Sequence, residues 1–182
     1  NDLSKKYRKR MQHIRASGKD VIRKEFSVDD IIRNKAQLFD LLKSVSTRQT
    51  IQMCTISEDY FIEIKKTYAD TFSLYGYYLA DKLIGFTSFI ERGDQLEFHY
   101  IGIDYDYNHT HSLYFNMLFD GVEKAIMAGK KELELGRTAR EAKANLGCRP
   151  VYFNDFIRIK SKTARLLADW IGGRFQTAMG EE

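Results

Sequence analysis

The stretch Leu96-Glu-Phe-His-Tyr-Ile101 alternates apolar and polar side chains, which is the period of a β-strand. A polar stretch, Asp104–His111, follows it. An apolar helical face then runs up to Gly129, and its members are Tyr114, Leu118, Val122 and Ala125. A second short strand is expected at Glu132–Leu135. Because a single helix joins the two strands, we predict a parallel pair with a right-handed crossover.

The carboxyl ends of these two strands are the expected binding edge. Parallel strands end on the same side of a sheet, so Asp104–His111 and Gly136–Thr138 should lie side by side. Ligands of open α/β sheets bind at this edge. Residues Thr138 to Glu141 have the spacing of a capping box and predict a short helix.

Length and composition favour one compact domain. The chain has 182 residues, of which 43% are hydrophobic, enough for a substantial core. Cys54 and Cys148 have neither zinc-site nor disulfide-framework spacing. No run reaches the ~20 apolar residues of a membrane helix, and no apolar leader segment opens the chain. We therefore expect a cytoplasmic protein with reduced thiols.

Positive charge is concentrated at the start of the chain. The first 24 residues contain nine basic side chains, opposed only by Asp2 and Asp20: Lys5, Lys6, Arg8, Lys9, Arg10, Arg15, Lys19, Arg23 and Lys24. Such a cluster can attract RNA, anionic lipid or a phosphorylated ligand. The alternative is a solvated face of a helix, which we expect over residues 3–16.

The remaining patterns predict a mixed α/β chain. We expect a strand at 21–26, a helix capped by Ser27 and a helix opened by Ser57-Glu-Asp59. Strands are expected at 72–79 and 83–91, and a last strand at 151–159. We place the domain boundary at residue 160, with a C-terminal helix and tail over 161–182.

This order of elements resembles the GNAT N-acyltransferase fold. The segment Tyr77–Gly85 is similar to its second and third strands. More specifically, the chain resembles the second domain of Fem-type aminoacyltransferases and related acetyltransferase-like proteins of peptidoglycan and polysaccharide biosynthesis. The matching stretches are Leu3–Arg10, Leu113-Tyr-Phe and Glu134-Leu-Gly-Arg137 with Lys143 and Gly147.

The resemblance implies an α+β fold: a mostly antiparallel sheet with one parallel βαβ pair, flanked by helices, over residues 1–160. It implies acyl transfer from acetyl-CoA, another acyl-CoA or aminoacyl-tRNA to a small-molecule or cell-wall precursor amine, without a metal. Fem-type proteins pair two such domains, so a second domain before Asn1 is expected. The alternative is an inactive GNAT-like domain that binds a partner, lipid or nucleic acid.

One departure concerns the donor. Acetyl-CoA enzymes of this fold carry a glycine-rich loop before the crossover helix, where backbone N–H groups bind the pyrophosphate. Here Tyr107-Asn-His-Thr-His-Ser112 contains no glycine. We therefore predict weak binding of CoA in that manner.

Candidate site residues follow from chemistry and position. His99, with an ordinary pKa of about 6.5, suits proton transfer from an amine, and Glu97 and Glu134 are alternative bases. Each has a structural alternative, as a half-buried strand residue or a solvated ion-pair partner. The candidates for binding substrate or cofactor are Asp104, Asn108, His109, His111, Gly136, Arg137 and Lys143. Arg137 offers a planar fork for phosphate or carboxylate.

Overall fold

The computed structural model describes residues 5–48, 56–136, 139–144, 146–152 and 160–161. The chain divides into two compact units, residues 1–148 and 149–182. The described residues of the second unit contain no helix or strand. The predicted strand at 151–159 is not formed at Val151 and Tyr152, and its remainder lies outside the described residues, as does the predicted C-terminal helix.

A five-stranded sheet forms the centre of the first unit, with its strands in chain order. The strands are β1 (Val21–Glu25), β2 (Phe72–Leu79), β3 (Lys82–Arg92), β4 (Gln95–Ile103) and β5 (Glu132–Glu134). Adjacent strands are antiparallel except β4 and β5, which are parallel. The predicted mixed sheet with one parallel pair is therefore confirmed.

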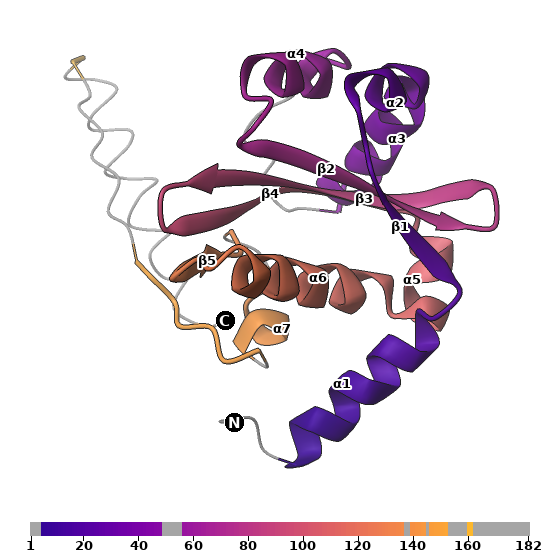
Figure 1. The fold of residues 1–182 in the computed structure, drawn as a ribbon, viewed down its shortest axis with the longest axis vertical. Coiled ribbons are helices and arrows are strands. Elements are labelled where there is room, and N and C mark those ends of the chain that lie inside the picture. The colour runs from indigo at the N-terminus through magenta and orange to yellow at the C-terminus, as the bar shows by residue number, and fades with distance from the viewer. Residues whose placement is uncertain (1–4, 49–55, 137–138, 145, 153–159, 162–182) are drawn as a thin grey trace. The chain divides into compact units, whose positions relative to one another are not determined.

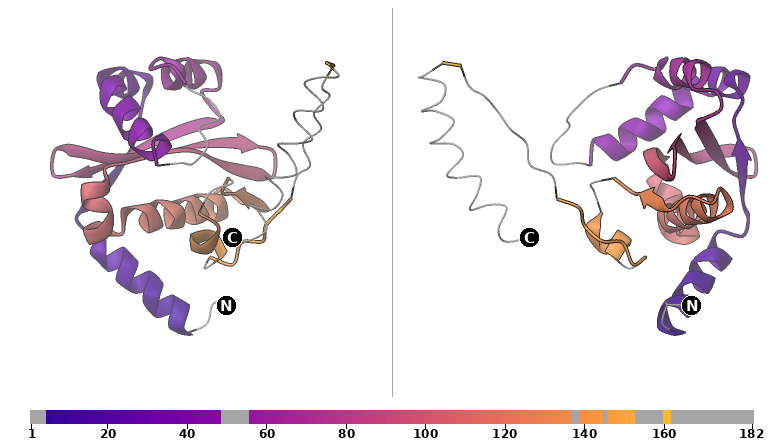
Figure 2. Two further views of the ribbon diagram at one scale, coloured as in Figure 1. Left: turned by 180° about the vertical axis from the view of Figure 1, so that it is seen from behind. Right: turned by 60° about the vertical axis from the view of Figure 1, so that its left-hand side comes forward.

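Helices cover both faces of the sheet (Figure 1). One face carries α2 (Val28–Arg33), α3 (Lys35–Ser46) and α4 (Tyr60–Thr67). The other carries α5 (Tyr105–His111), α6 (Leu113–Met127) and α7 (Arg140–Ala144). The N-terminal α1 (Lys5–Ser17) contacts α5 and α6 and runs obliquely away from the sheet on their side (Figure 2). None of the helices described is long and apolar enough to cross a membrane.

Each face has its own hydrophobic core. Phe26, Leu38, Phe61, Phe72 and Phe86 lie in the core beneath α2, α3 and α4, which we call the α4-side core. Leu96, Phe98, Leu113, Met117 and Leu118 lie in the core beneath α6, the α6-side core. Strands β2 and β3 are buried on both faces over most of their length, which explains their long apolar runs, whereas β1 is mostly exposed.

The helix predicted to follow Ser27 is interrupted. Ser27 caps α2 as expected, in a reciprocal capping box with Asp30. Asn34 then leaves the helical conformation, with φ −102° and ψ 10°, and α3 begins at the next residue. A second difference is α5, since Asp104–His111 is mostly helical and not a loop. Asp104 accepts a hydrogen bond from the Asp106 N–H and so caps this short helix.

Candidate active site

A β-bulge in β4 changes the direction of its side chains. Thr87 of β3 pairs with Ile101 and Phe89 pairs with Phe98, so His99 and Tyr100 together face Ser88. The Tyr100 N–H donates to Ser88 Oγ at 3.0 Å. His99 contacts the rings of Tyr60 and Phe72, and Tyr100 packs in the α4-side core. Simple alternation had placed Tyr100 with Leu96 and Phe98, which is wrong.

Strands β4 and β5 part just before this bulge. Their pairing covers only Gln95–Glu97 against Glu132–Glu134, whereas β4 continues to Ile103. The N–H groups of Tyr100 and Asp104 point to β3, where they bond Ser88 Oγ and the Ile84 carbonyl. By alternation, the N–H and C=O of Ile101 point the other way, to the side that β5 has left. Among the described strands, none occupies this stretch of edge.

The prediction that the carboxyl ends of β4 and β5 lie side by side is wrong, although their parallel pairing is confirmed. Strand β5 ends opposite Glu97, whereas β4 continues to Ile103. At the rise of a strand, the stretch from Glu97 to Ile103 spans ~20 Å. The cause is the register. The N–H groups of Lys131 and Glu132 both bond the Asp94 carbonyl, so β5 starts level with the start of β4. Asp104–His111 therefore lies far from Gly136.

His99 is half-buried in an aromatic setting. Its Nε2 lies 3.0 Å from Tyr60 Oη, and its Nδ1 lies 3.3 Å from Ser88 Oγ. Burial, together with the positive charge of Arg92, lowers the pKa of His99 to about 4. The imidazole is therefore neutral near pH 7. The expected ordinary pKa is wrong, because Tyr60 of α4 and the ring of Phe72 shield the imidazole from water.

The three predicted catalytic side chains lie on one face of the sheet. Glu97 and Glu134 are direct cross-strand partners, and Leu96 and Leu133, which flank them, pack toward the α6-side core. Glu97 and Glu134 therefore point to the opposite face, the one that also carries His99. The Glu97 carboxylate lies 2.9 Å from the Arg92 guanidinium. Glu134 is exposed. Neither Arg92 nor Tyr60 had been selected from the sequence.

A cavity of about 650 Å³ opens beside His99. Its walls come from α4 and from the end of the β3–β4 hairpin, and they include Tyr60, Ile64, Ile90 and Arg92. We call it the α4 pocket. It lies on the same face of the sheet as the two carboxylates.

The residues at the far end of β4 have structural partners. Lys82 Nζ lies 2.9 Å from Asp104 Oδ2. Asn108 Oδ1 accepts from the Tyr114 N–H at 2.9 Å and so caps α6. His109 is exposed, and His111 is half-buried with its Nδ1 2.8 Å from Thr110 Oγ1. None of these four predicted residues lies near His99.

The first turn of α6 is filled by the chain itself. Asn116 Nδ2 donates to the Ile14 carbonyl at 2.9 Å and to the His111 carbonyl at 3.0 Å. A Cβ atom at Gly18 would lie 2.4 Å from the same nitrogen, so the end of α1 fits closely here. Asn108 bonds the Tyr114 N–H of this turn, and the turn has no glycine, so the residues present do not form a cradle for a pyrophosphate.

The segment after β5 is only partly described. Gly136 has φ +71°, and Lys143 Nζ donates to its carbonyl at 3.1 Å. Lys143 is buried, which lowers the pKa of its amine. It therefore holds the turn after β5 in place. Arg137 and Thr138 lie outside the described residues, so the expected ligand role of Arg137 and the Thr138 cap stay predictions.

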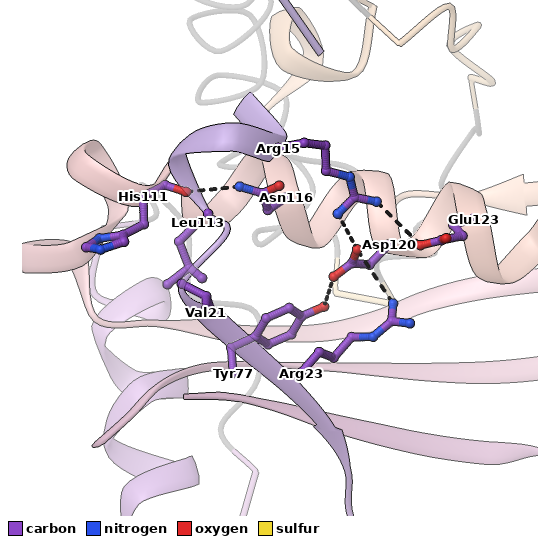
Figure 3. A pocket seen from close by; sticks show the side chains of 10 residues that line it. Arg15, Val21, Arg23, Tyr77, His111, Leu113, Asn116, Asp120 and Glu123 are labelled. Carbon is purple, nitrogen blue, oxygen red and sulfur yellow. Dashed lines mark hydrogen bonds and ion pairs between the residues drawn. The ribbon is translucent and has the colours of Figure 1, made fainter. Parts of the chain in front are cut away.

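A second, smaller cavity of about 150 Å³ lies between α1, β1, β2 and α6 (Figure 3). Asp120 lines this cavity and joins the side chains around it. One carboxylate oxygen lies 2.5 Å from Arg15 and 3.6 Å from Arg23, and the other accepts from Tyr77 Oη at 2.9 Å. A carboxylate within the apolar pattern of α6 was the available signal for this buried network. Its bonds are all to neighbouring elements, so we assign it a structural role.

Among the described residues, no group of three or more His, Cys, Asp or Glu side chains could hold a metal ion. The sequence matches no protein-family model, and no curated protein is significantly similar to it.

Several solved structures share the fold of this chain. An aminoglycoside acetyltransferase from an uncultured soil metagenomic sample superposes with a TM-score of 0.55 at 9% identity, covering 78% of this chain and 98% of that one. A GNAT-family acetyltransferase from Staphylococcus aureus gives 0.53 at 13%, covering 76% and 98%. An integron cassette protein from Vibrio cholerae gives 0.55 at 12%, covering 82% and 98%. The chain has the fold of the GNAT acetyltransferases.

Proposed function

We propose that this chain transfers an acyl group from an activated donor to an amine. The observation that carries the proposal is the open edge of β4 beside the bulge. An extended donor can add to a free strand edge by main-chain hydrogen bonds, and Ile101 offers one N–H and one C=O for this. Glu97, Glu134 and His99 lie on one face of the same part of the sheet.

The reaction needs positioning more than covalent help from the protein. The acceptor ammonium first loses one proton to solvent water. The neutral amine nitrogen then attacks the acyl carbonyl, a C–N bond forms, and the bond to the leaving thiolate or alkoxide breaks. The backbone N–H of Ile101 is placed to stabilise the oxygen as negative charge develops. After attack the nitrogen becomes acidic, so a carboxylate such as Glu97 or Glu134 suffices to take its proton. With its lowered pKa, His99 serves as a neutral hydrogen-bonding group.

The donor is proposed to be a thioester or an aminoacyl ester held by its acyl arm. The filled first turn of α6 supports a donor that does not place a pyrophosphate there. Acyl-CoA bound in another manner and aminoacyl-tRNA, as in Fem-type enzymes, both meet this condition. The acceptor is proposed to be a small amine, including cell-wall precursors, since one similar structure is an aminoglycoside acetyltransferase bound to sisomicin.

Substitution at Ile101 tests the open edge. Ile101→Pro removes the N–H that faces away from β3, whereas Ile101→Ala removes the same side chain and keeps the N–H. We expect acyl transfer to an amine panel to fall ~100-fold or more in Ile101→Pro relative to Ile101→Ala, as for loss of an oxyanion donor. Melting temperatures confirm that both variants fold. Equal rates of the two folded variants would refute the proposed role of this edge.

A binding domain without turnover is the second candidate, and the filled first turn of α6 favours it. The basic cluster on α1 is then the proposed contact for RNA or anionic lipid. Part of this cluster already serves folding, because Arg10 and Arg15 lie over the rings of Phe115 and Phe119. Lys9 and Lys19 are exposed and remain available for a partner. Salt-sensitive RNA or vesicle binding with no acyl transfer would select this candidate.

A further inference from the structure

We propose that the α4 pocket binds the acceptor, and that the acceptor is a small primary amine with an apolar, preferably aromatic, body. This inference rests on the proposed function, whose acyl carbonyl would lie at the open edge of β4. His99 belongs both to the bulge and to the pocket wall. An acceptor held there is therefore within reach of the bulge from the face that carries the carboxylates.

The floor of the α4 pocket suits a flat apolar group. Tyr60, Ile64, Ile90 and His99 are half-buried, so each already presents one side to the cavity and one to the protein. Tyr60 and His99 have ring centroids 5.8 Å apart, and Tyr60 meets Tyr100 edge to face at 5.8 Å. Aromatic rings prefer such tilted and edge contacts, and an aromatic ligand adds one more member to the cluster.

The size of the pocket matches a small molecule. A volume of about 650 Å³ lies within the usual range of ligand sites, roughly 300–1,000 Å³. The rim is more polar than the floor. It carries Thr67, Tyr68 and Thr71, which are exposed. The body of the ligand is thus covered below, while its substituents meet hydroxyl groups at the entrance.

The charges around the pocket favour a cation over an anion. Arg92 at the rim is neutralised by Glu97 at 2.9 Å, and Lys66 on α4 is neutralised by Glu63 at 3.0 Å. Glu134 adds a carboxylate beside Glu97. His99 brings no positive charge near pH 7. Of the described residues that line the pocket, only Arg92 is a cation and it is paired, so an entering ammonium group meets carboxylates there.

Direct binding of three matched probes tests this without any donor. Phenethylamine, 2-phenylethanol and phenylacetate share one ring and differ in charge, and spermine supplies charge without a ring. By titration calorimetry on the whole chain, we expect phenethylamine to bind about tenfold tighter than the alcohol, because charge-assisted hydrogen bonds are roughly twice as strong as neutral ones. We expect phenylacetate to bind least.

Two pairs of variants locate the site. Thr67→Trp places an indole at the pocket entrance, and Ile126→Trp places one on an exposed position of α6 as its control. We expect Thr67→Trp to weaken the binding of phenethylamine by about tenfold or more, and Ile126→Trp to leave its affinity unchanged. Glu97→Gln leaves Arg92 without its carboxylate, so it should lower the preference for amine over alcohol more than Glu63→Gln, which lies on the opposite wall.

The outcomes separate this inference from the proposed function. Equal binding of amine and alcohol, tighter binding of spermine than of phenethylamine, no binding of any probe, or indifference to Thr67→Trp would each overturn the inference. Acyl transfer to another amine under those results would leave the proposed function intact. Selective amine binding without acyl transfer from any donor would keep the pocket and reject the proposed function.

Discussion

Removal of the Asp120 carboxylate should destabilise the fold, because it leaves a buried hydroxyl without its hydrogen-bond acceptor. The side chain is one-tenth exposed, and it joins Arg15 of α1 and Arg23 of β1 to Tyr77 of β2 (Figure 3). In Asp120→Ala, the Tyr77 hydroxyl loses its acceptor while the ring stays 2% exposed. Thr87 Oγ1, at 3.4 Å, is the other polar atom near it.

Two costs add up in this variant. A buried hydroxyl without a good partner costs ~1–3 kcal/mol. The two arginine side chains are 39% and 37% exposed, so loss of their ion pairs adds up to ~1 kcal/mol, as for partly solvated pairs. The free energy of unfolding should fall by ~1–4 kcal/mol, and the melting temperature by ~2–16 °C.

Urea denaturation of four proteins measures this: wild type, Asp120→Ala, Tyr77→Phe and the double variant. Because Tyr77→Phe removes the stranded hydroxyl, the double variant should lose ~1–2 kcal/mol less than the sum of the singles. Asp40→Ala, at an exposed position of α3, is the control and should stay within ~0.5 kcal/mol of wild type. Additive single effects, or a loss below ~1 kcal/mol in Asp120→Ala, would refute the reasoning.

Three other substitutions have defined outcomes. Hydrogen bonds from Lys24, the Ser27 N–H and Arg33 hold the pKa of Asp30 well below its ordinary value, so Asp30→Asn should be less stable than wild type at pH 7 in urea unfolding. That difference should persist above the unfolded pKa of about 3.9 and shrink as the pH falls further; a constant difference at pH 2 would contradict it. NMR titration of His99 should give a midpoint near 4, and a midpoint above 6 would show that the ring is solvated. Between about pH 6.5 and 4 only the unfolded histidine gains a proton, so wild type should lose stability as the pH falls through this range, and His99→Gln should not show this loss. Gly102→Ala would place a Cβ 2.2 Å from Phe86 and 2.8 Å from Leu41, so calorimetric melting should report ~1–3 kcal/mol of destabilisation, and a melting temperature equal to wild type would mean that the core yields there.

Most of the fold could be predicted because local patterns and tertiary packing agree. The strands expected at 72–79 and 83–91 and the helix expected after Leu113 are all present in the structure. The Ser27 cap does too, since both its hydrogen bonds are local. The helix α5 was missed because its stability depends on capping by Asp104 within a mostly polar stretch, which has no apolar period to detect.

The candidate site was predictable only in part. Glu97 and His99 share a face, as the alternation predicts, but Glu134 joins them only because the register of β5 makes it the cross-strand partner of Glu97, and that register has no signal in the residues themselves. The partners of His99 come from α4 and β3, so its pKa depended on contacts 39 and 11 residues away along the chain. Asn108 and Lys143 were selected as ligand-binding residues, and instead they bond the backbone of neighbouring elements, Tyr114 of α6 and Gly136 after β5.

The strand order β1-β2-β3-β4-β5 also has a meaning for synthesis on the ribosome. Each strand joins the one made before it, so the sheet can grow from one edge as the chain emerges, and no strand has to insert between two that are already paired. The contact between Arg15 and Asp120 spans 105 residues and cannot form until α6 has left the exit tunnel. The N-terminal helix is thus the first element made, but its ion pair with α6 forms only after the first four strands have emerged, and a nascent chain halted before α6 should expose it to proteases.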